Sequence, residues 1–275
     1  MNMLAPISLN NYNQVYPPKT PNIAFGSTQR GYMMDDKKGI SCYTVFFRGD
    51  LSWKNFAKYA DSNFKHKKKV NVINGACSDG TESYSLAIAI RENLSLKRQD
   101  KFLPIHAYDY DKEIIKAANS GLILMSGSDL ISIKLNIPNE YKYFEETDEV
   151  LDINGDNTAH FKYTKKVKDN LRKDVIFEQK DIFDVLENLE DDSNSIVMFR
   201  NAIGHLGDEF AFNFAKLASE KLKSGSLVVI GGLDRSKTDI VEYLEERGFT
   251  EVMSNVFRKN EEKTSFIEKI KNFFK

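Results

Sequence analysis

The chain has 275 residues, a hydrophobic fraction of 41%, and 39 Lys plus Arg against 40 Asp plus Glu. A chain of this length buries roughly 75% of its unfolded surface, so it needs neither disulfides nor a structural metal. The balanced charge argues against a bulk nucleic-acid binder. Two cysteines, Cys42 and Cys77, argue against a disulfide scaffold and a cysteine zinc site. No apolar run approaches the ~18 residues of a membrane-spanning helix. The segment from Met1 to Leu9 is a poor signal peptide, so we expect a protein of the reducing cytoplasm.

The two ends of the chain differ from its middle. Residues 1–40 hold four of the six prolines and many Asn, Gln and Gly residues, which is typical of an extended or partly disordered arm. Residues 261–275 predict an amphipathic C-terminal helix, because Phe266, Ile270 and Phe273 share one helical face with lysines opposite. We expect this helix to pack on the domain, with a membrane-surface or partner-binding helix as the alternative. Residues 41–275 are interpreted as one domain.

From residue 41 onwards, apolar segments typical of strands alternate with segments of helical periodicity. In chain order, we expect a strand at 70–73, a helix at 82–93, a strand at 105–108, a helix at 112–119, strands at 175–177 and 195–199, a helix at 208–223, a strand at 227–230, a helix at 237–247 and a last strand at 251–257. This alternation predicts an α/β fold with a mainly parallel, Rossmann-like sheet. Residues 141–172 alternate aromatic and charged residues around Asn154-Gly155, a hairpin-turn signal, and predict a small antiparallel β insertion.

Polar residues follow the expected strands where each strand ends. Asp109 follows the second strand, where a carboxylate can accept hydrogen bonds from both ribose hydroxyls of a nucleoside cofactor. Asp181 follows the third strand and can accept from an adenine amino group, and Arg200 and Asn201 follow the fourth. Because the carboxyl ends of parallel strands share one edge of the sheet, these side chains are expected to lie close together.

The loop after the first strand, residues 74–82, is made largely of small residues. Gly75 and Gly80 would let the backbone approach a ligand closely. Neither the G-x-G-x-x-G pattern nor the G-x-x-x-x-G-K-[ST] phosphate loop is present, which disfavours NAD and ATP. A small-residue loop followed by acids after the second and third strands suits S-adenosylmethionine, which has a ribose and an adenine but no phosphate.

Five short segments resemble, in order, those of the chemotaxis receptor methyltransferases of the CheR type. They correspond to the family patterns T-x-F-F-R, C-S-T-G-E-E-P-Y-S-L-A, S-D-I-D, V-x-F-x-x-x-N-L and C-R-N. In this chain they are Thr44 to Arg48, Cys77 to Ala87, Tyr108 to Asp111, Val175 to Ile182 and Phe199 to Asn201. The resemblance implies a class I S-adenosylmethionine-dependent methyltransferase that forms glutamyl methyl esters on receptor or other signalling proteins. The expected β insertion falls where the family has a small β-subdomain.

The resemblance also implies a set of cofactor contacts, carried over position by position. They are Thr44, Arg48, Glu82, Asp109, Asp181, Ile182, Arg200 and Asn201.

The chain departs from the family at several positions. Thr81 and Ser83 replace a Glu and a Pro of the loop, and Cys42 replaces an Asn before the first signature. His205 stands where the family has a Tyr near the methyl-transfer site. We expect the helical N-terminal domain of the family to be missing or reduced to the Pro-rich arm. The cofactor half of the site is therefore better supported than the substrate half.

Arg48 and His205 are the candidate catalytic residues. Arg48 could orient a carboxylate or the cofactor with its planar fork of donors. His205 is either a tolerated hydrogen-bonding replacement for Tyr or a general base, which an amine or hydroxyl nucleophile would need and a carboxylate would not. Three functions therefore remain open: a protein-glutamate methyltransferase, a methyltransferase for another nucleophile, and a non-catalytic cofactor-binding sensor or scaffold. The other histidines are isolated in the sequence and predict no metal site: His66, His106 and His160.

Overall fold

The computed structural model of the chain describes residues 44–149, 161–189 and 194–261. The expected N-terminal arm, the Asn154-Gly155 turn and, beyond Glu261, the expected C-terminal helix lie outside these residues.

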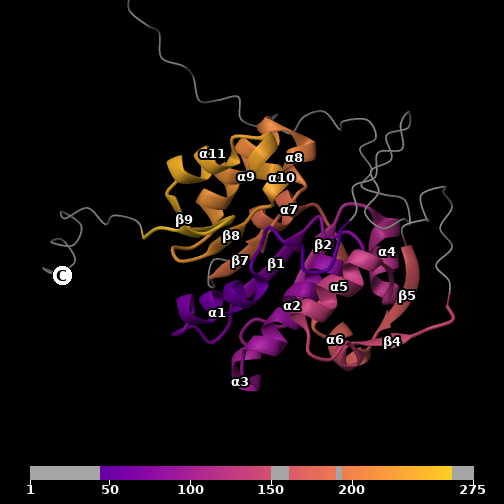
Figure 1. Ribbon diagram of the computed structural model, residues 1–275. Coiled ribbons are helices and arrows are strands. Elements are labelled where there is room, and N and C mark those ends of the chain that lie inside the picture. Colours follow the sequence, from indigo (N-terminus) through magenta and orange to yellow (C-terminus); the bar gives the residue numbers. More distant parts are fainter. Residues whose placement is uncertain (1–43, 150–160, 190–193, 262–275) are drawn as a thin grey trace, which may run out of the picture.

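A seven-stranded sheet crosses the described structure in the order β6-β2-β1-β7-β8-β10-β9 (Figure 1). The strands are β1 (Asn71–Gly75), β2 (Ile105–Asp109), β6 (Val175–Gln179), β7 (Ser195–Met198), β8 (Leu227–Val229), β9 (Phe249–Met253) and β10 (Val256–Lys259). The first five in space are parallel, and β10 runs antiparallel to both neighbours, which confirms the predicted α/β fold. The expected last strand, 251–257, is instead two strands, because Asn255 adopts a left-handed turn conformation with φ 64°. The sequence order of the strands runs one way from β1 to β2 and β6, and the other way from β7 to β8. The place between β1 and β7 is therefore the switch point of the sheet.

Helices cover both faces of this sheet (Figure 1). They are α1 (Trp53–Asn63), α2 (Thr81–Asn93), α3 (Leu96–Gln99), α4 (Lys112–Ser120), α5 (Gly127–Asn136), α6 (Asp169–Arg172), α7 (Ile182–Glu187), α8 (Ile203–Leu206), α9 (Asp208–Lys221), α10 (Gly232–Lys237) and α11 (Ile240–Glu246), with a 3₁₀ turn at Glu140–Lys142. Successive residues of β1 serve opposite faces: Val72 packs with α1, α2, α4 and α5, and Ile73 packs with α7, α8, α9 and α11. Burial on both faces explains why the strands read as continuous apolar runs.

A second, three-stranded antiparallel sheet has the order β3-β5-β4, with β3 (Leu122–Ser126), β4 (Phe144–Glu146) and β5 (Phe161–Val167). The predicted β insertion therefore begins at Leu122 rather than at residue 141. Its first strand was not recognised because Leu122–Ser126 has no alternation and pairs with residues about 40 positions later. Helix α5, which follows, also escaped prediction, although Ser126 and Asp129 form a capping box at its start.

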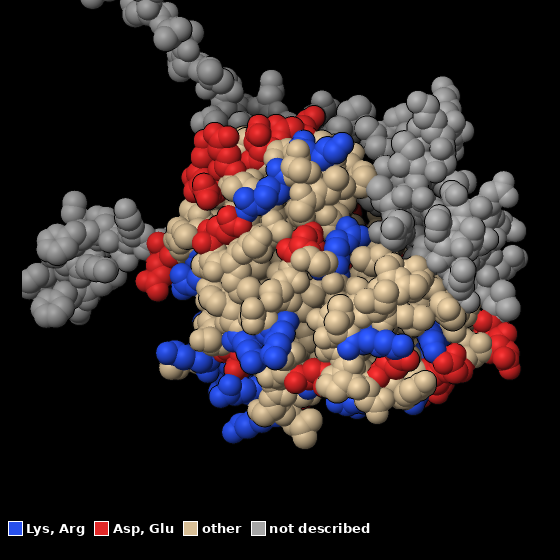
Figure 2. Space-filling view, viewed as in Figure 1, with Lys and Arg blue, Asp and Glu red and all other residues tan. Residues whose placement is uncertain are grey.

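Charged side chains are segregated on the surface. Figure 2 shows acidic side chains gathered over α9 and α11 and basic side chains gathered over α1 and α3. The net charge of −1 thus conceals two oppositely charged regions.

Candidate active site

The loop after β1 is closely held against the end of β2. Ala76, Ser78 and Gly80 all have positive φ, a conformation that costs non-glycine residues about 1–2 kcal/mol. The Asp109 carboxylate supports the loop by accepting hydrogen bonds from the Ser78 and Asp111 amides, at 3.0 and 3.1 Å. Asp109 is only 2% exposed, and this burial raises its pKa to about 6 although the two amides oppose the shift. The sequence predicted its position but not its role in holding the loop.

Gly75 and Gly80 leave room for neighbouring side chains, a role that the sequence did not indicate. A Cβ at Gly75 would lie 2.7 Å from Ile182, and a Cβ at Gly80 would lie 2.5 Å from the Phe177 ring. Gly80 also has φ +86°, which disfavours any side chain there. The protein's own side chains therefore fill the space beside both glycines.

Asp181 and Ile182 lie at the start of α7, beside this loop. The Asp181 carboxylate caps the helix by accepting from the Phe183 amide at 2.8 Å. Burial raises the pKa of Asp181, and Ile182 is 6% exposed where it covers Gly75. Both residues lie at the carboxyl edge, as predicted.

The segment from Thr44 to Arg48 is attached to two helices. The Phe46 amide donates to Asp129 at the start of α5, at 2.9 Å, and the Phe47 amide donates to Ser85 of α2, at 3.0 Å. Thr44, Phe46 and Phe47 are buried. Asp129 is itself fully buried, so it joins the start of α5 to this segment.

Arg200 at the end of β7 is a fully buried cation held by two carboxylates. It donates to Glu82 at 2.7 Å and to Asp50, and its guanidinium lies 5.1 Å from the centre of the Trp53 ring. Asp50 also accepts from the Gly232 amide at 2.7 Å and so joins α10 to the same cluster. Burial raises the pKa of Glu82, and the positive charges of Arg200 and Arg48 oppose that shift.

Asn201 is held by a carboxylate that sequence analysis missed. Asp234, fully buried in α10, accepts from the amides of Asn201, Gly204 and Gly231 at 2.6, 2.9 and 2.7 Å. Burial raises the pKa of Asp234 to about 6 against the effect of these amides. The Asn201 side chain in turn accepts from the Leu233 amide at 3.1 Å. Asp234 therefore ties the end of β7 to the end of β8.

His205 lies in α8, partly buried, within the electrostatic reach of Arg48. Burial lowers the pKa of His205, and the positive charges of Lys237 and Arg48 lower it further. This shift favours the neutral imidazole. The charge of Arg48 also opposes the burial that raises the pKa of Glu82, so the two candidate catalytic residues and a predicted cofactor contact share one region.

Asp50 and Asp234 could have been found from position alone. Asp50 follows the first signature by two residues, and Asp234 follows the small residues at the end of the strand formed by 227–229. The rule that ligand sites collect at strand ends applies to Asp234, whereas Asp50 lies in the turn before α1 and is marked only by the signature before it.

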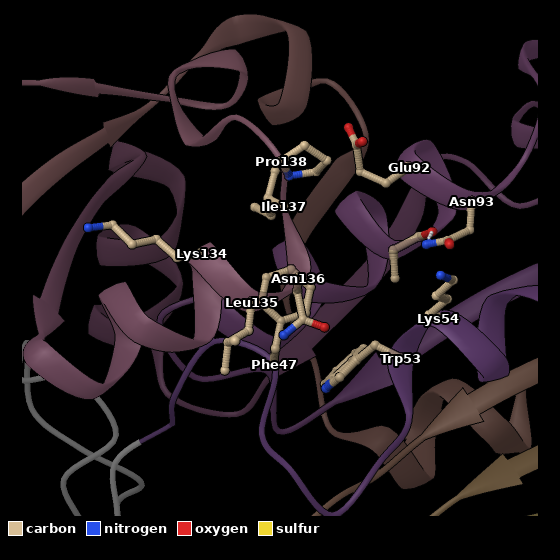
Figure 3. Close-up of a pocket in the computed structure, with 11 residues that line it drawn as sticks. Phe47, Trp53, Lys54, Glu92, Asn93, Lys134, Leu135, Asn136, Ile137 and Pro138 are labelled. Atoms are coloured by element: carbon tan, nitrogen blue, oxygen red, sulfur yellow. Dashed lines mark hydrogen bonds between the residues drawn. The ribbon is translucent and has the colours of Figure 1, made fainter.

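A separate pocket of about 360 Å³ lies between α1, the last turns of α2 and the end of α5. Figure 3 shows Phe47 and Trp53 on one side of it and Ile137 and Pro138 on the other. Its lining contains none of the predicted site residues, although the Trp53 ring also contacts the buried Arg200. The candidate active site is therefore the edge of the sheet and not this pocket.

A mainly parallel sheet with polar residues at its switch point is typical of α/β domains that bind a ligand at the carboxyl ends of the strands. Residues 43–252 match the family model "CheR methyltransferase, SAM binding domain". Because this match covers most of the chain, the chain belongs to the CheR methyltransferase family, and its cofactor is S-adenosylmethionine.

Several solved structures are similar to the chain at low identity. A precorrin-6y C5,15-methyltransferase from Geobacter metallireducens GS-15 is 10% identical, with a TM-score of 0.37 over 78% of this chain and 79% of that one. A putative S-adenosylmethionine-dependent methyltransferase from Methanococcus maripaludis is 14% identical, with a TM-score of 0.41 over 78% of this chain and 87% of that one. A protein from Corynebacterium glutamicum is 12% identical, with a TM-score of 0.42 over 78% of this chain and 82% of that one. The search of curated proteins found no match.

The polar groups at this edge suit such a cofactor. Among the buried side-chain atoms of the described residues that form no hydrogen bond, five lie at this edge: Asn74 Oδ1, Ser78 Oγ, Thr81 Oγ1, Arg200 Nε and Asn201 Nδ2. Each uncompensated buried polar atom costs about 1–3 kcal/mol, which a bound polar ligand would recover. The set mixes donors and acceptors, as a ligand with hydroxyl, amine and carboxylate groups requires.

Two further searches cover the described residues only. Within 44–149, 161–189 and 194–261, no helix combines the length and apolar character needed to cross a membrane. The same ranges contain no group of three His, Cys, Asp or Glu side chains that could hold a metal ion.

Proposed function

We propose that this methyltransferase forms methyl esters on glutamate side chains of a protein substrate. The observation that carries the proposal is the cluster of polar and charged side chains beside the switch point of the sheet, in which Arg48, Glu82 and Arg200 lie near His205. A substrate glutamate has an ordinary pKa of about 4.3 and is ionised at neutral pH, so it needs no general base. Arg48 would orient this carboxylate with its planar donors.

The residues proposed to hold the cofactor lie on both sides of the switch point. Asp109 would accept from the ribose hydroxyls and Asp181 from the adenine amino group. The other proposed contacts are Thr44, Arg48, Gly75, Gly80, Glu82, Ile182, Arg200 and Asn201. When bound, the cofactor supplies an electrophilic methyl group on a sulfonium. The contribution of the protein is then orientation and charge placement. We also propose residues 41–275 as the methyltransferase domain.

A second candidate function is methyl transfer to an amine or hydroxyl. The observation that favours it is the partly buried His205, whose lowered pKa favours the neutral imidazole that could accept a proton from such a nucleophile. The third function considered above, a non-catalytic cofactor-binding sensor or scaffold, predicts binding with no transfer.

One experiment separates the three functions. The purified chain is incubated with methyl-labelled S-adenosylmethionine and synthetic peptides that offer Glu, Lys or Ser as the acceptor. We expect label in the Glu peptide that is released by mild base, as an ester is. Base-stable label in the Lys or Ser peptide would support the second candidate, and binding of S-adenosylhomocysteine without any transfer would support the third.

Matched variants identify the site in the same assay. Arg48→Ala should abolish transfer, and Asp109→Ala should weaken S-adenosylhomocysteine binding by about tenfold to a hundredfold, because a hydrogen bond to a charged group contributes about 1.5–3 kcal/mol. Asp100→Ala, which changes an exposed carboxylate elsewhere, should retain both properties. Transfer that is unchanged in Arg48→Ala would remove Arg48 from the mechanism.

A further inference from the structure

Asp234 holds the end of β7, helix α8 and the end of β8 together with one buried carboxylate. Its Oδ2 accepts from the amides of Asn201, after β7, and Gly231, after β8, at 2.6 and 2.7 Å. Its Oδ1 accepts from the amide of Gly204 in α8 at 2.9 Å. Helices α8 and α10, which follow the two strand ends, lie side by side (Figure 1). Because all three donors belong to the backbone, the carboxylate fixes the path of the chain here.

The backbone of Asn201 is in a conformation that needs such support. Its φ of 56° lies in the left-handed region, which few residues other than glycine adopt, although asparagine tolerates it better than most. The amide of this same residue donates to Asp234, so the carboxylate acts directly on the strained position. Loss of the hydrogen bond would let the backbone of Asn201 relax and its side chain turn away.

The side chain of Asn201 lies directly over Gly231. A Cβ added at Gly231 would lie 2.3 Å from both Cγ and Oδ1 of Asn201 and 2.5 Å from its Nδ2. Gly231 itself has φ −100° and ψ 165°, an extended conformation that any residue can adopt. The glycine is therefore needed at this position to make room for the Asn201 side chain and not for its own backbone.

The amide group of Asn201 is bound within the protein at one end only. Its Oδ1 accepts from the Leu233 amide at 3.1 Å, which determines the direction in which the group faces. Its Nδ2 is buried and forms no hydrogen bond with the described residues. A buried donor without an acceptor is unfavourable, so an acceptor on a bound ligand would stabilise this arrangement.

We infer that Asp234 is a positioning residue of the cofactor site, which holds Asn201 in the conformation from which its Nδ2 donates to bound S-adenosylmethionine. The inference rests on the proposed contact between Asn201 and the cofactor and assigns the residue that maintains this contact. Asp234 is fully buried and acts through Asn201.

A double-mutant cycle on the binding of S-adenosylhomocysteine to the full chain, measured by calorimetric titration, tests the inference. Asn201→Gly keeps the left-handed backbone and its amide but removes Nδ2, and should weaken binding by about threefold to tenfold. Asp234→Asn places an NH₂ group opposite at least one of the three amide donors, and should weaken binding by a similar factor. In the Asn201→Gly background, Asp234→Asn should change the dissociation constant by less than about twofold, because the side chain that Asp234 positions is absent.

The outcomes separate the inference from the contact on which it rests. If Asn201→Gly binds S-adenosylhomocysteine as the wild type does, the proposed contact is wrong and the inference fails with it. If Asn201→Gly weakens binding but Asp234→Asn does not, the contact stands and the positioning role is overturned. Equal weakening by Asp234→Asn in both backgrounds also overturns it, because a merely structural carboxylate would act in this way.

A matched control alters a buried carboxylate at the opposite edge of the sheet. Asp174 precedes β6 and is bound by Arg91. Asp174→Asn should lower the stability of the chain but leave the dissociation constant for S-adenosylhomocysteine unchanged within about twofold. This control shows that destabilisation alone does not weaken binding.

Gly231→Ala keeps the test decisive if Asp234→Asn does not fold. The added Cβ would displace the Asn201 side chain, so we expect S-adenosylhomocysteine to bind about threefold to tenfold more weakly. In the Asn201→Gly background the three nearest atoms are gone, and Gly231→Ala should change binding by less than about twofold. Equal losses in both backgrounds would mean that the position of the Asn201 side chain does not control binding, and would overturn the inference.

Discussion

Two buried charged residues at the switch point, Asp109 after β2 and Arg200 after β7, are held in different ways, while Asp234 after β8 is held by backbone amides as Asp109 is. On the side of β1 and β2, Asp109 is a single buried carboxylate supported by backbone amides, and its pKa is raised to about 6. On the side of β7, Arg200 is a buried cation enclosed by Glu82 and Asp50. A lone carboxylate in a poorly solvated place responds to pH and to ligands, whereas a paired buried charge is fixed by its partners. We therefore expect substitution of Asp109 to weaken cofactor binding and substitution of Arg200 to lower the free energy of unfolding.

The largest effect should follow loss of the buried cation. Arg200→Leu leaves the carboxylates of Glu82 and Asp50 without their shared partner, and should lower the free energy of unfolding by about 3–5 kcal/mol. Urea denaturation measures this loss. Arg235→Leu, which removes a more exposed ion pair with Glu251, should cost about 1 kcal/mol or less. Similar losses in both variants would show that burial of the Arg200 ion pairs does not make them more important for stability than an exposed pair.

The pH dependence of S-adenosylhomocysteine binding should reveal the contribution of Asp109. Its ionised carboxylate accepts hydrogen bonds, and its pKa of about 6 means that protonation competes with binding below that pH. The dissociation constant for S-adenosylhomocysteine should be constant above pH ~6 and should rise by up to about tenfold per pH unit below it. Calorimetric titration at several pH values measures this profile. Asp109→Asn should bind more weakly at pH 7 and lose most of the pH dependence, and Asp100→Asn should keep the wild-type profile.

The smallest effect is expected at His205. If the acceptor is a glutamate carboxylate, His205→Phe should change the rate of transfer by no more than about threefold, because no proton has to be removed. A general base would instead contribute about a hundredfold or more and would produce a rising limb in the pH–rate profile below its pKa. Initial rates with the Glu and Lys peptides, measured across pH, decide between these outcomes. His205→Tyr, which introduces the residue that the family has at this position, serves as the control for packing.

Much of the large sheet could be predicted from local sequence. The strands of the parallel sheet are short apolar segments followed by polar or small residues, and the helices between them have clear ends, such as Gly121 after α4. Prediction failed where the pattern is not local. Strand β3 could not be separated from its surroundings without knowing its partner β5.

The sequence by itself indicated the strands of the parallel sheet, most of the longer helices between them, the family and the residue types at the strand ends, because short-range periodicity and short motifs specify these. Only the tertiary structure decided which charges meet. Arg200 is 118 residues from Glu82 and 150 residues from Asp50 along the chain. Packing of α2 and the Asp50 segment against the end of β7 excludes water there and forces these charges to pair. Burial of Asp109 at the end of β2 raises its pKa, and no local pattern of residues could have indicated this.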